Sequence, residues 1–174
     1  MNAVQRSMVE RMKGAAMLDV ATYEEVEADT SATGQAAVVV VIAAVARAIG
    51  AIGDGGLGMI FGTLIAAVIG WLLWAGITYL IGDKLLGGTA TWGELLRTLG
   101  FAQAPGLLAV FGFIPVLGGL VKFVVGIWIL IAGIVAIRQA LDFSTGKAIV
   151  TALLGWLAMV VLAVLGFGLG RIGG

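Results

Sequence analysis

Five polar side chains lie inside long apolar stretches or at their edges, and they are the residues of this chain that could do chemistry. They are Arg47, Gln103, Arg138, Gln139 and Asp142. Apolar surroundings offer no hydrogen bonds to a charged group or an amide. Such groups therefore pair with each other, bond to backbone carbonyls or reach water. The chemistry that they offer is recognition by hydrogen bonds and charge.

Catalysis is not expected. The chain has no His and no Cys, which removes the commonest general base, common metal ligands and thiolate chemistry. The glycine-rich phosphate loop, the G-x-S-x-G elbow and the H-E-x-x-H zinc motif are all missing from the sequence. An intramembrane aspartyl protease needs two acids within apolar stretches, but Asp54, Asp83, Glu94 and Asp142 lie at ends or in loops. We expect no enzyme, no cofactor and no metal site.

The stretches around the polar residues are long enough to cross a membrane. Of 174 residues, 61% are apolar and 11% are charged, against about 45–50% and 25% in soluble domains. A helix needs about 20 apolar residues to cross the hydrocarbon layer. The sequence therefore predicts an all-α bundle of five transmembrane helices, over residues 35–52, 57–81, 100–114, 120–141 and 148–168. The formal net charge of zero gives no indication of nucleic acid binding.

Arg47 comes about five residues before the end of the first span. At the bilayer centre an arginine costs about 2.5–3.5 kcal/mol, so we expect its side chain to extend to the headgroups. The alternative is a paired or cavity-lining position. Arg138 and Asp142 lie one helical turn apart, and we expect a local ion pair between them.

Gln103 and Gln139 both fall toward the predicted inner half of the bundle. They could bond across helices, or to carbonyls that Pro105 leaves free. Proline removes a helix hydrogen bond and clashes with the preceding turn, so a bend is expected near residues 101–105. A pathway for a polar substrate would run past Gln103, this bend and the fourth span.

Residues 91–99 predict a short helix lying in the membrane surface. Thr91 and Glu94 fit a capping box at its start. Its apolar residues follow helical spacing on one side: Trp92, Leu95, Leu96 and Leu99. The candidate interface for a lipid or a partner protein comprises Trp92, Glu94, Leu96 and Arg97.

Residues 1–34 predict a cytoplasmic segment that is first amphipathic and then acidic. Val4, Met8 and Met12 share one side of a surface helix over residues 1–17. Thr22 and Glu25 fit the capping box of a second short helix. The acidic residues could face a basic partner, or they could simply be solvated: Asp19, Glu24, Glu25, Glu27 and Asp29.

Small residues recur every four positions on two of the predicted spans. One stripe runs Gly58-xxx-Gly62-xxx-Ala66-xxx-Gly70, and a shorter one joins Gly166 and Gly170. Small residues let helix backbones approach each other in a bilayer. The first interpretation is packing within one chain, and the alternative is the face of a homo-oligomer.

The distribution of basic residues predicts the orientation. With the N-terminus in the cytoplasm, the inner segments hold Arg6, Arg11, Lys13, Lys84, Arg97, Arg138 and Lys147, and the outer ends hold Arg47, Lys122 and Arg171. Five spans then place the C-terminus outside.

Several motifs together resemble the Yip family of Ypt/Rab-interacting membrane proteins, in its prokaryotic branch. The central one is the stretch from Gly88 to Pro105, with Thr91-Trp92-Gly93-Glu94 at its core, and Ile114-Pro115, Gly118-Gly119 and residues 136–141 follow it in order. The opening, from Glu10-Arg11 to Tyr23-Glu24-Glu25, matches as well, so the resemblance covers essentially the whole chain. It implies a cytosolic N-terminus and a five-span membrane domain over residues 35–174. The Asp-Leu-Tyr-Gly-Pro segment of the eukaryotic members is missing, so their association with Rab-type GTPases is not carried over.

Two hypotheses for function follow. The first is a non-enzymatic, membrane-organising scaffold in a prokaryotic plasma membrane that binds lipid or an unidentified protein at the cytoplasmic face. The second is a small membrane transporter or channel.

Overall fold

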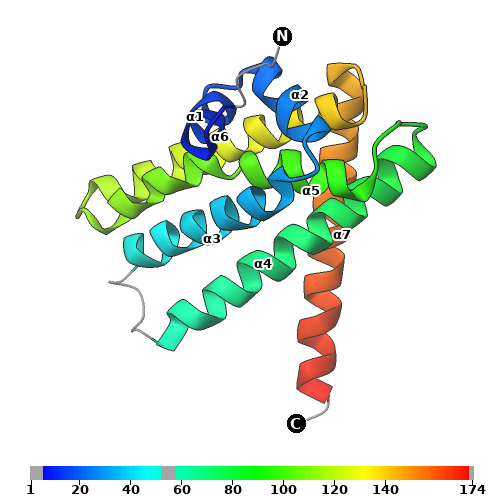
Figure 1. Cartoon of the computed structure of the whole chain (residues 1–174). Helices are drawn as coiled ribbons and strands as arrows, with labels where there is room; N and C mark the ends of the chain where they lie inside the picture. The colour runs from blue at the N-terminus through cyan, green and yellow to red at the C-terminus, as the bar shows by residue number, and fades with distance from the viewer. Residues whose placement is uncertain (1–5, 52–57, 173–174) are drawn as a thin grey trace.

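The computed structural model describes residues 6–51 and 58–172. Over these residues it is all-helical, without strands (Figure 1). Seven α-helices follow one another: α1 (Met8–Ala16), α2 (Val20–Ala28), α3 (Ala32–Gly50), α4 (Gly58–Tyr79), α5 (Trp92–Phe101), α6 (Leu117–Ala140) and α7 (Thr145–Ile172). A π-helical segment, η2 (Leu80–Leu85), prolongs α4, and a 3₁₀ segment, η3 (Ala104–Phe113), follows α5.

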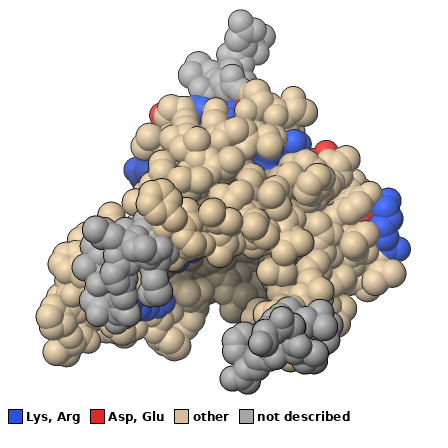
Figure 2. Space-filling view, turned by 90° about the horizontal axis from the view of Figure 1, so that it is seen from below, with Lys and Arg blue, Asp and Glu red and all other residues tan. Residues whose placement is uncertain are grey.

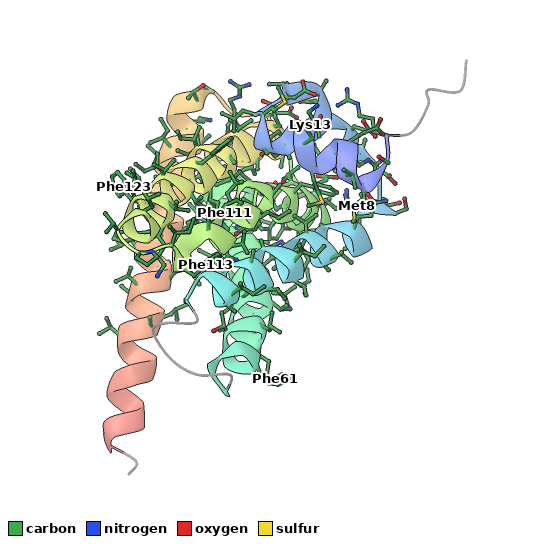
Figure 3. The ribbon with its side chains drawn as sticks, turned by 90° about the vertical axis from the view of Figure 1, so that its left-hand side faces the viewer. Met8, Lys13, Phe61, Phe111, Phe113 and Phe123 are labelled. Atoms are coloured by element: carbon green, nitrogen blue, oxygen red, sulfur yellow. The ribbon has the colours of Figure 1, made fainter. Side chains whose placement is uncertain are left out.

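Within the described residues, five helices are long and apolar enough to cross a membrane. They are Ala32–Gly50, Phe61–Leu85, Trp92–Phe113, Leu117–Ala140 and Thr145–Val164. Large apolar side chains remain exposed along them, such as Phe61 at 75% and Phe123 at 66%, on the outside of the bundle (Figure 3). Seen from below, the surface carries few charged groups (Figure 2). Contact with lipid tails costs such an apolar surface no free energy, whereas contact with water is unfavourable. The chain is therefore a multi-span membrane protein.

Four of the five predicted spans agree with the observed helices to within a few residues. The stretch predicted over residues 57–81 is longer than expected, because η2 continues it to Leu85. The predicted span ends at Ile81 because Asp83 and Lys84, which follow it, are charged. The two side chains form an ion pair of 2.7 Å with each other, and Lys84 lies over the Tyr79 ring.

The third span differs from the prediction. The helix expected at the membrane surface over residues 91–99 is α5, and its apolar side is covered by protein, with Leu95, Leu96 and Leu99 at most 8% exposed. With η3 it forms the span Trp92–Phe113, and 67% of an apolar 18-residue stretch of this span is buried, against 17–44% for the corresponding stretches of the other four. The amphipathic pattern was correct, but a pattern does not say whether lipid or protein covers the apolar side.

The helix type changes where a bend was predicted, near residues 101–105. The α-helical hydrogen bonding ends at Phe101, and η3 begins at Ala104 with Pro105 in its first turn. Proline suits a first helical turn because its missing N–H has no helical partner there.

Close backbone packing involves α3 rather than the stripe on α4. A Cβ at Gly50 would lie 1.9 Å from the Ala109 carbonyl oxygen, and a Cβ at Gly100 would lie 2.7 Å from the Cβ of Ala36. On α4, by contrast, a Cβ at Gly62 or Gly70 would meet nothing within 4 Å. Packing within the chain, predicted for that stripe, is therefore wrong at these two positions. The surroundings of the second stripe, Gly166 and Gly170, lie outside what the structure describes.

Candidate interaction surface and intramembrane polar site

The helices α1 and α2 fold against the spans and form what we call the N-terminal cap (residues 8–28). Helix α1 begins with a capping box, in which the Ser7 hydroxyl accepts from the Glu10 N–H at 3.3 Å and the Glu10 carboxylate accepts from the Ser7 N–H at 2.7 Å. This box was not predicted, although Ser7 and Glu10 have the required spacing. It fixes where α1 begins, and so which residues of α1 face inward.

Arg11 is the residue that anchors α1. Its side chain is fully buried, and its guanidinium lies 2.9 Å from Glu25, 2.7 Å from Asp29 and 3.1 Å from Gln35 of α3. A buried charge is tolerated only when it is paired and hydrogen-bonded, and each of the three guanidinium nitrogens donates to one of these acceptors. Arg11 therefore joins both cap helices to the first span.

The acidic residues of α2 are mostly paired within the chain. Asp19 lies 3.0 Å from Arg6, and the Thr22 hydroxyl donates to it at 2.6 Å; these contacts lower the pKa of Asp19. Thr22 was predicted as the N-cap of α2, but Asp19 occupies that position and α2 begins at Val20. The Glu25 carboxylate is shared by Arg6 and Arg11. Internal ion pairs thus use Asp19, Glu25 and Asp29, while a basic partner for Glu24 and Glu27 stays a prediction.

Arg97 of α5 binds the C-terminal end of α2. The side chain is 5% exposed, and its Nε donates to the carbonyl oxygens of Val26 and Glu27, both at 3.0 Å. These carbonyls belong to the last turn of α2, where no helical N–H reaches them. A cation at a helix C-terminus also interacts favourably with the helix dipole. Arg97 therefore completes α2 with a side chain from α5.

The predicted interface on α5 does not form one surface. Trp92 is 47% exposed, and Glu94 accepts from the Thr91 N–H at 2.7 Å in the predicted capping box. Leu96, at 8% exposed, lies in the core, and its carbonyl oxygen accepts from the Trp71 indole at 3.0 Å. With Arg97 buried as well, only Trp92 and Glu94 of the four predicted residues face outward.

Glu27 is partly buried among other acids where the cap meets α5 and α6. Burial, followed by the nearby charges of Glu24, Glu94 and Asp142, raises the pKa of Glu27 to about 7, although Arg97 acts in the opposite direction. The carboxyl group therefore changes protonation close to neutral pH.

Arg138 and Asp142 do not form the predicted ion pair. The Arg138 Nε donates to the Gln139 side chain at 2.8 Å, and the Gln139 amide bonds to Glu24 of the cap. Asp142 accepts from the Thr89 hydroxyl at 2.7 Å. Because α6 ends at Ala140 and Asp142 has a φ of +53°, the two residues no longer have helical spacing.

Arg47 and Gln103 form a polar pair inside the bundle. The Arg47 Nη1 donates to the Gln103 Oε1 at 3.1 Å, between α3 and the junction of α5 with η3. The expectation that Arg47 extends to the headgroups is thus replaced by the alternative, a paired position. Pro105 and Gly106 are buried beside this pair. A Cβ at Gly106 would lie 3.1 Å from the Cβ of Ala43 and 3.5 Å from the guanidinium, so Gly106 packs closely against α3 beside the pair.

Gln103 also lines a cavity of about 250 Å³ between four spans. The remaining walls are apolar or aromatic and include Trp74 of α4, Gly133 of α6 and Trp156 of α7. A second depression, on the cap, has mixed charge and is lined by Arg6, Glu10, Lys13, Gly14, Met17 and Asp19. Over the residues that the structure describes, no group of three or more acidic side chains could hold a metal ion.

Comparison with known proteins matches residues 19–166 to one family, the Yip1 domain. No curated protein and no solved structure matches the chain. The matched residues include α2, all five spans and the Arg47–Gln103 pair, while α1 precedes them.

Proposed function

On the premise that the chain belongs to the Yip1 domain family, we propose that it is a non-enzymatic scaffold that binds a partner protein through its N-terminal cap. The family generally comprises non-enzymatic trafficking membrane proteins. We place this chain in its prokaryotic branch and in the plasma membrane, with the cap in the cytoplasm.

The observation that carries the proposal is the rigid attachment of the cap. Arg11, Arg97 and the Trp128 indole, which donates to the Ala16 carbonyl oxygen at 2.7 Å, tie it to α3, α5 and α6. A surface that is already folded binds without the entropy cost of ordering it. On this surface Val9 and Met17 remain 70% and 69% exposed, beside charged neighbours such as Lys13 (Figure 3).

The charge of the depression favours a protein over a lipid headgroup. It is lined by two basic and two acidic side chains, with Met17 among them. Anionic lipids are attracted to clusters of Lys and Arg, whereas protein interfaces combine an apolar centre with charges of both signs. We therefore assign the depression to a protein partner of mixed charge.

Site-specific photocrosslinking tests this function. A photoreactive amino acid at Met17 in native membranes should give a discrete crosslinked protein, and the same label at Leu85, which is 75% exposed on η2, should not. Met17→Ser and Val9→Ser should each reduce the crosslink from a label at Lys13, because each removes an exposed apolar contact for the partner. Neither variant should unfold the cap, since both side chains are exposed. Equal, diffuse crosslinking from positions 17 and 85 would contradict the proposal.

The orientation can be tested separately, because the chain has no cysteine. Single-cysteine variants at Thr30 and Lys122 should react with a membrane-impermeant maleimide from opposite sides. Labelling of Thr30→Cys in intact cells would reverse the assigned orientation.

A small transporter or channel is the second candidate, favoured by the cavity beside the Arg47–Gln103 pair. Gln103 is the one polar amide in the cavity wall, since the other lining residues are apolar or tryptophan. A path for a polar solute needs more such groups along its length. Flux into liposomes that is lost in Gln103→Leu and kept in Met17→Ser would favour transport over the scaffold.

A further inference from the structure

We infer that the cavity beside Gln103 is a binding site for a neutral, lipid-soluble carbonyl compound with a ring of about quinone size. This inference is independent of the partner surface on the cap. It rests on where the cavity lies, which residues form its wall and which atom it offers to a ligand.

The cavity lies near the middle of the spans that enclose it. Trp74, Gln103, Leu130 and Trp156 each fall close to the midpoint of their spans. A site at this depth is surrounded by hydrocarbon rather than by water. Its ligand must therefore dissolve in the hydrocarbon layer.

Exposed residues of α6 and α7 form part of the cavity wall. Leu130 and Trp156 line the cavity and are 55% and 61% exposed. Below their connection these two helices diverge (Figure 1). A molecule dissolved among lipid tails can enter there, whereas a solute from water would first have to cross hydrocarbon.

The hydrogen bond to Arg47 determines which atom Gln103 offers. A guanidinium only donates, so the side-chain atom of Gln103 that faces it must be the oxygen. The NH₂ group then occupies the other edge of the amide, and no acceptor for it is found among the described residues. Without water at this depth, an NH₂ group favours a ligand that brings an acceptor. The charge of Arg47 on the oxygen also makes the NH₂ group a better donor.

Volume and wall chemistry indicate a ring. An apolar cavity of roughly 150 Å³ binds benzene, so about 250 Å³ holds a six-membered ring with several substituents. Two indoles, Trp74 and Trp156, supply aromatic walls, and planar rings pack well against them. One donor and aromatic walls together suit an uncharged ring carbonyl.

Duroquinone and durene are matched probes, because both are tetramethylated six-membered rings and only duroquinone has carbonyl groups. The full chain in bicelles should show saturable quenching of tryptophan fluorescence by duroquinone. Competition with durene gives the affinity of the ring without an acceptor. In Gln103→Leu the affinity for duroquinone should fall about tenfold, as for one lost hydrogen bond, while the affinity for durene should stay unchanged.

Filling the cavity tests its location. A Cβ at Gly133 meets nothing within 4 Å, so Gly133→Leu places its side chain in open space and should abolish the binding of both probes. Gly119→Leu is the matched control, since Gly119 lies on the same helix, is equally open and does not line the cavity. Gly126→Leu repeats the test should Gly133→Leu unfold. Equal affinity of wild type and Gln103→Leu for duroquinone, or equal loss in Gly119→Leu and Gly133→Leu, would overturn the inference.

Discussion

The Nε of Arg97 donates to the carbonyl oxygen of Glu27 at 3.0 Å, joining α5 to the end of α2 across 70 positions of the chain. Arg97→Met should free the last turn of α2, because hydrogen bonds to charged groups contribute about 1.5–3 kcal/mol each. Amide hydrogen exchange of residues 20–28 should then become faster. Arg47→Met is the matched control, since Arg47 bonds to Gln103 inside the bundle and not to the cap. Equal exchange in the two variants would show that Arg97 does not hold the cap.

Arg11→Met should destabilise the whole cap, because it leaves Glu25 and Asp29 partly buried without their shared cation. Breaking a buried ion pair costs about 3–5 kcal/mol. Arg6→Met should cost about 0–1 kcal/mol, since the Arg6 side chain is 39% exposed. Thermal unfolding followed by tryptophan fluorescence measures both. The double variant Arg11→Met with Asp29→Asn should recover part of the loss, and a double variant that recovers nothing would contradict the pairing.

Protonation of Glu27 should make stability depend on pH near neutrality. Its pKa is about 7 in the fold, against 4.5 for an unperturbed glutamate. Between these values the unfolded chain loses the proton first, so stability falls as the pH rises from 4.5 to 7. Glu27→Gln removes this dependence and should be more stable than wild type at pH 8, by on the order of 1 kcal/mol after solvent screening.

Glu10→Gln provides the control of opposite sign. Hydrogen bonds from Ser7 lower the pKa of Glu10, so its contribution is present above pH 4.5 and lost as the pH falls below it. Glu10→Gln should therefore be less stable than wild type at pH 8. Parallel pH profiles of the wild type and Glu27→Gln would refute the assignment for Glu27.

The spans could be predicted from the sequence because composition alone determines which segments enter hydrocarbon. The cap could not. Arg11 looks like a solvated residue of an amphipathic helix, and its partners are 14–24 positions away. The contacts of Arg97 could not be predicted either, because its acceptors are backbone carbonyls, which every residue has.

The polar pair inside the bundle was predictable only in part. An arginine and a glutamine within apolar stretches indicate a need for partners. The sequence does not say that Arg47 and Gln103 satisfy each other, because that depends on how closely α3 approaches η3.

The close approach of α3 to η3 predicts that a larger residue at Gly50 destabilises the fold. A Cβ there would lie 1.9 Å from the Ala109 carbonyl oxygen, whereas a Cβ at Gly34 of the same helix meets nothing within 4 Å. Gly50→Ala should cost at least about 1–3 kcal/mol through overpacking. Gly34→Ala should be neutral or stabilise by up to about 1 kcal/mol through helix propensity. Thermal unfolding of both variants measures the difference, and equal values would mean that α3 and η3 are not in contact at Gly50.

The bond between Arg47 and Gln103 predicts unequal costs for removing its two ends. Gln103→Leu leaves a charge without its acceptor inside the bundle, whereas Arg47→Met leaves only a neutral amide oxygen. Gln103→Leu should therefore be the more destabilising change, by about 1–2 kcal/mol. Adding Arg47→Met to Gln103→Leu should restore stability, because the unpaired charge is then gone. A double-mutant cycle of unfolding in bicelles gives the coupling energy. Strict additivity would mean that the Arg47 side chain is solvated by headgroups and that the bond contributes nothing.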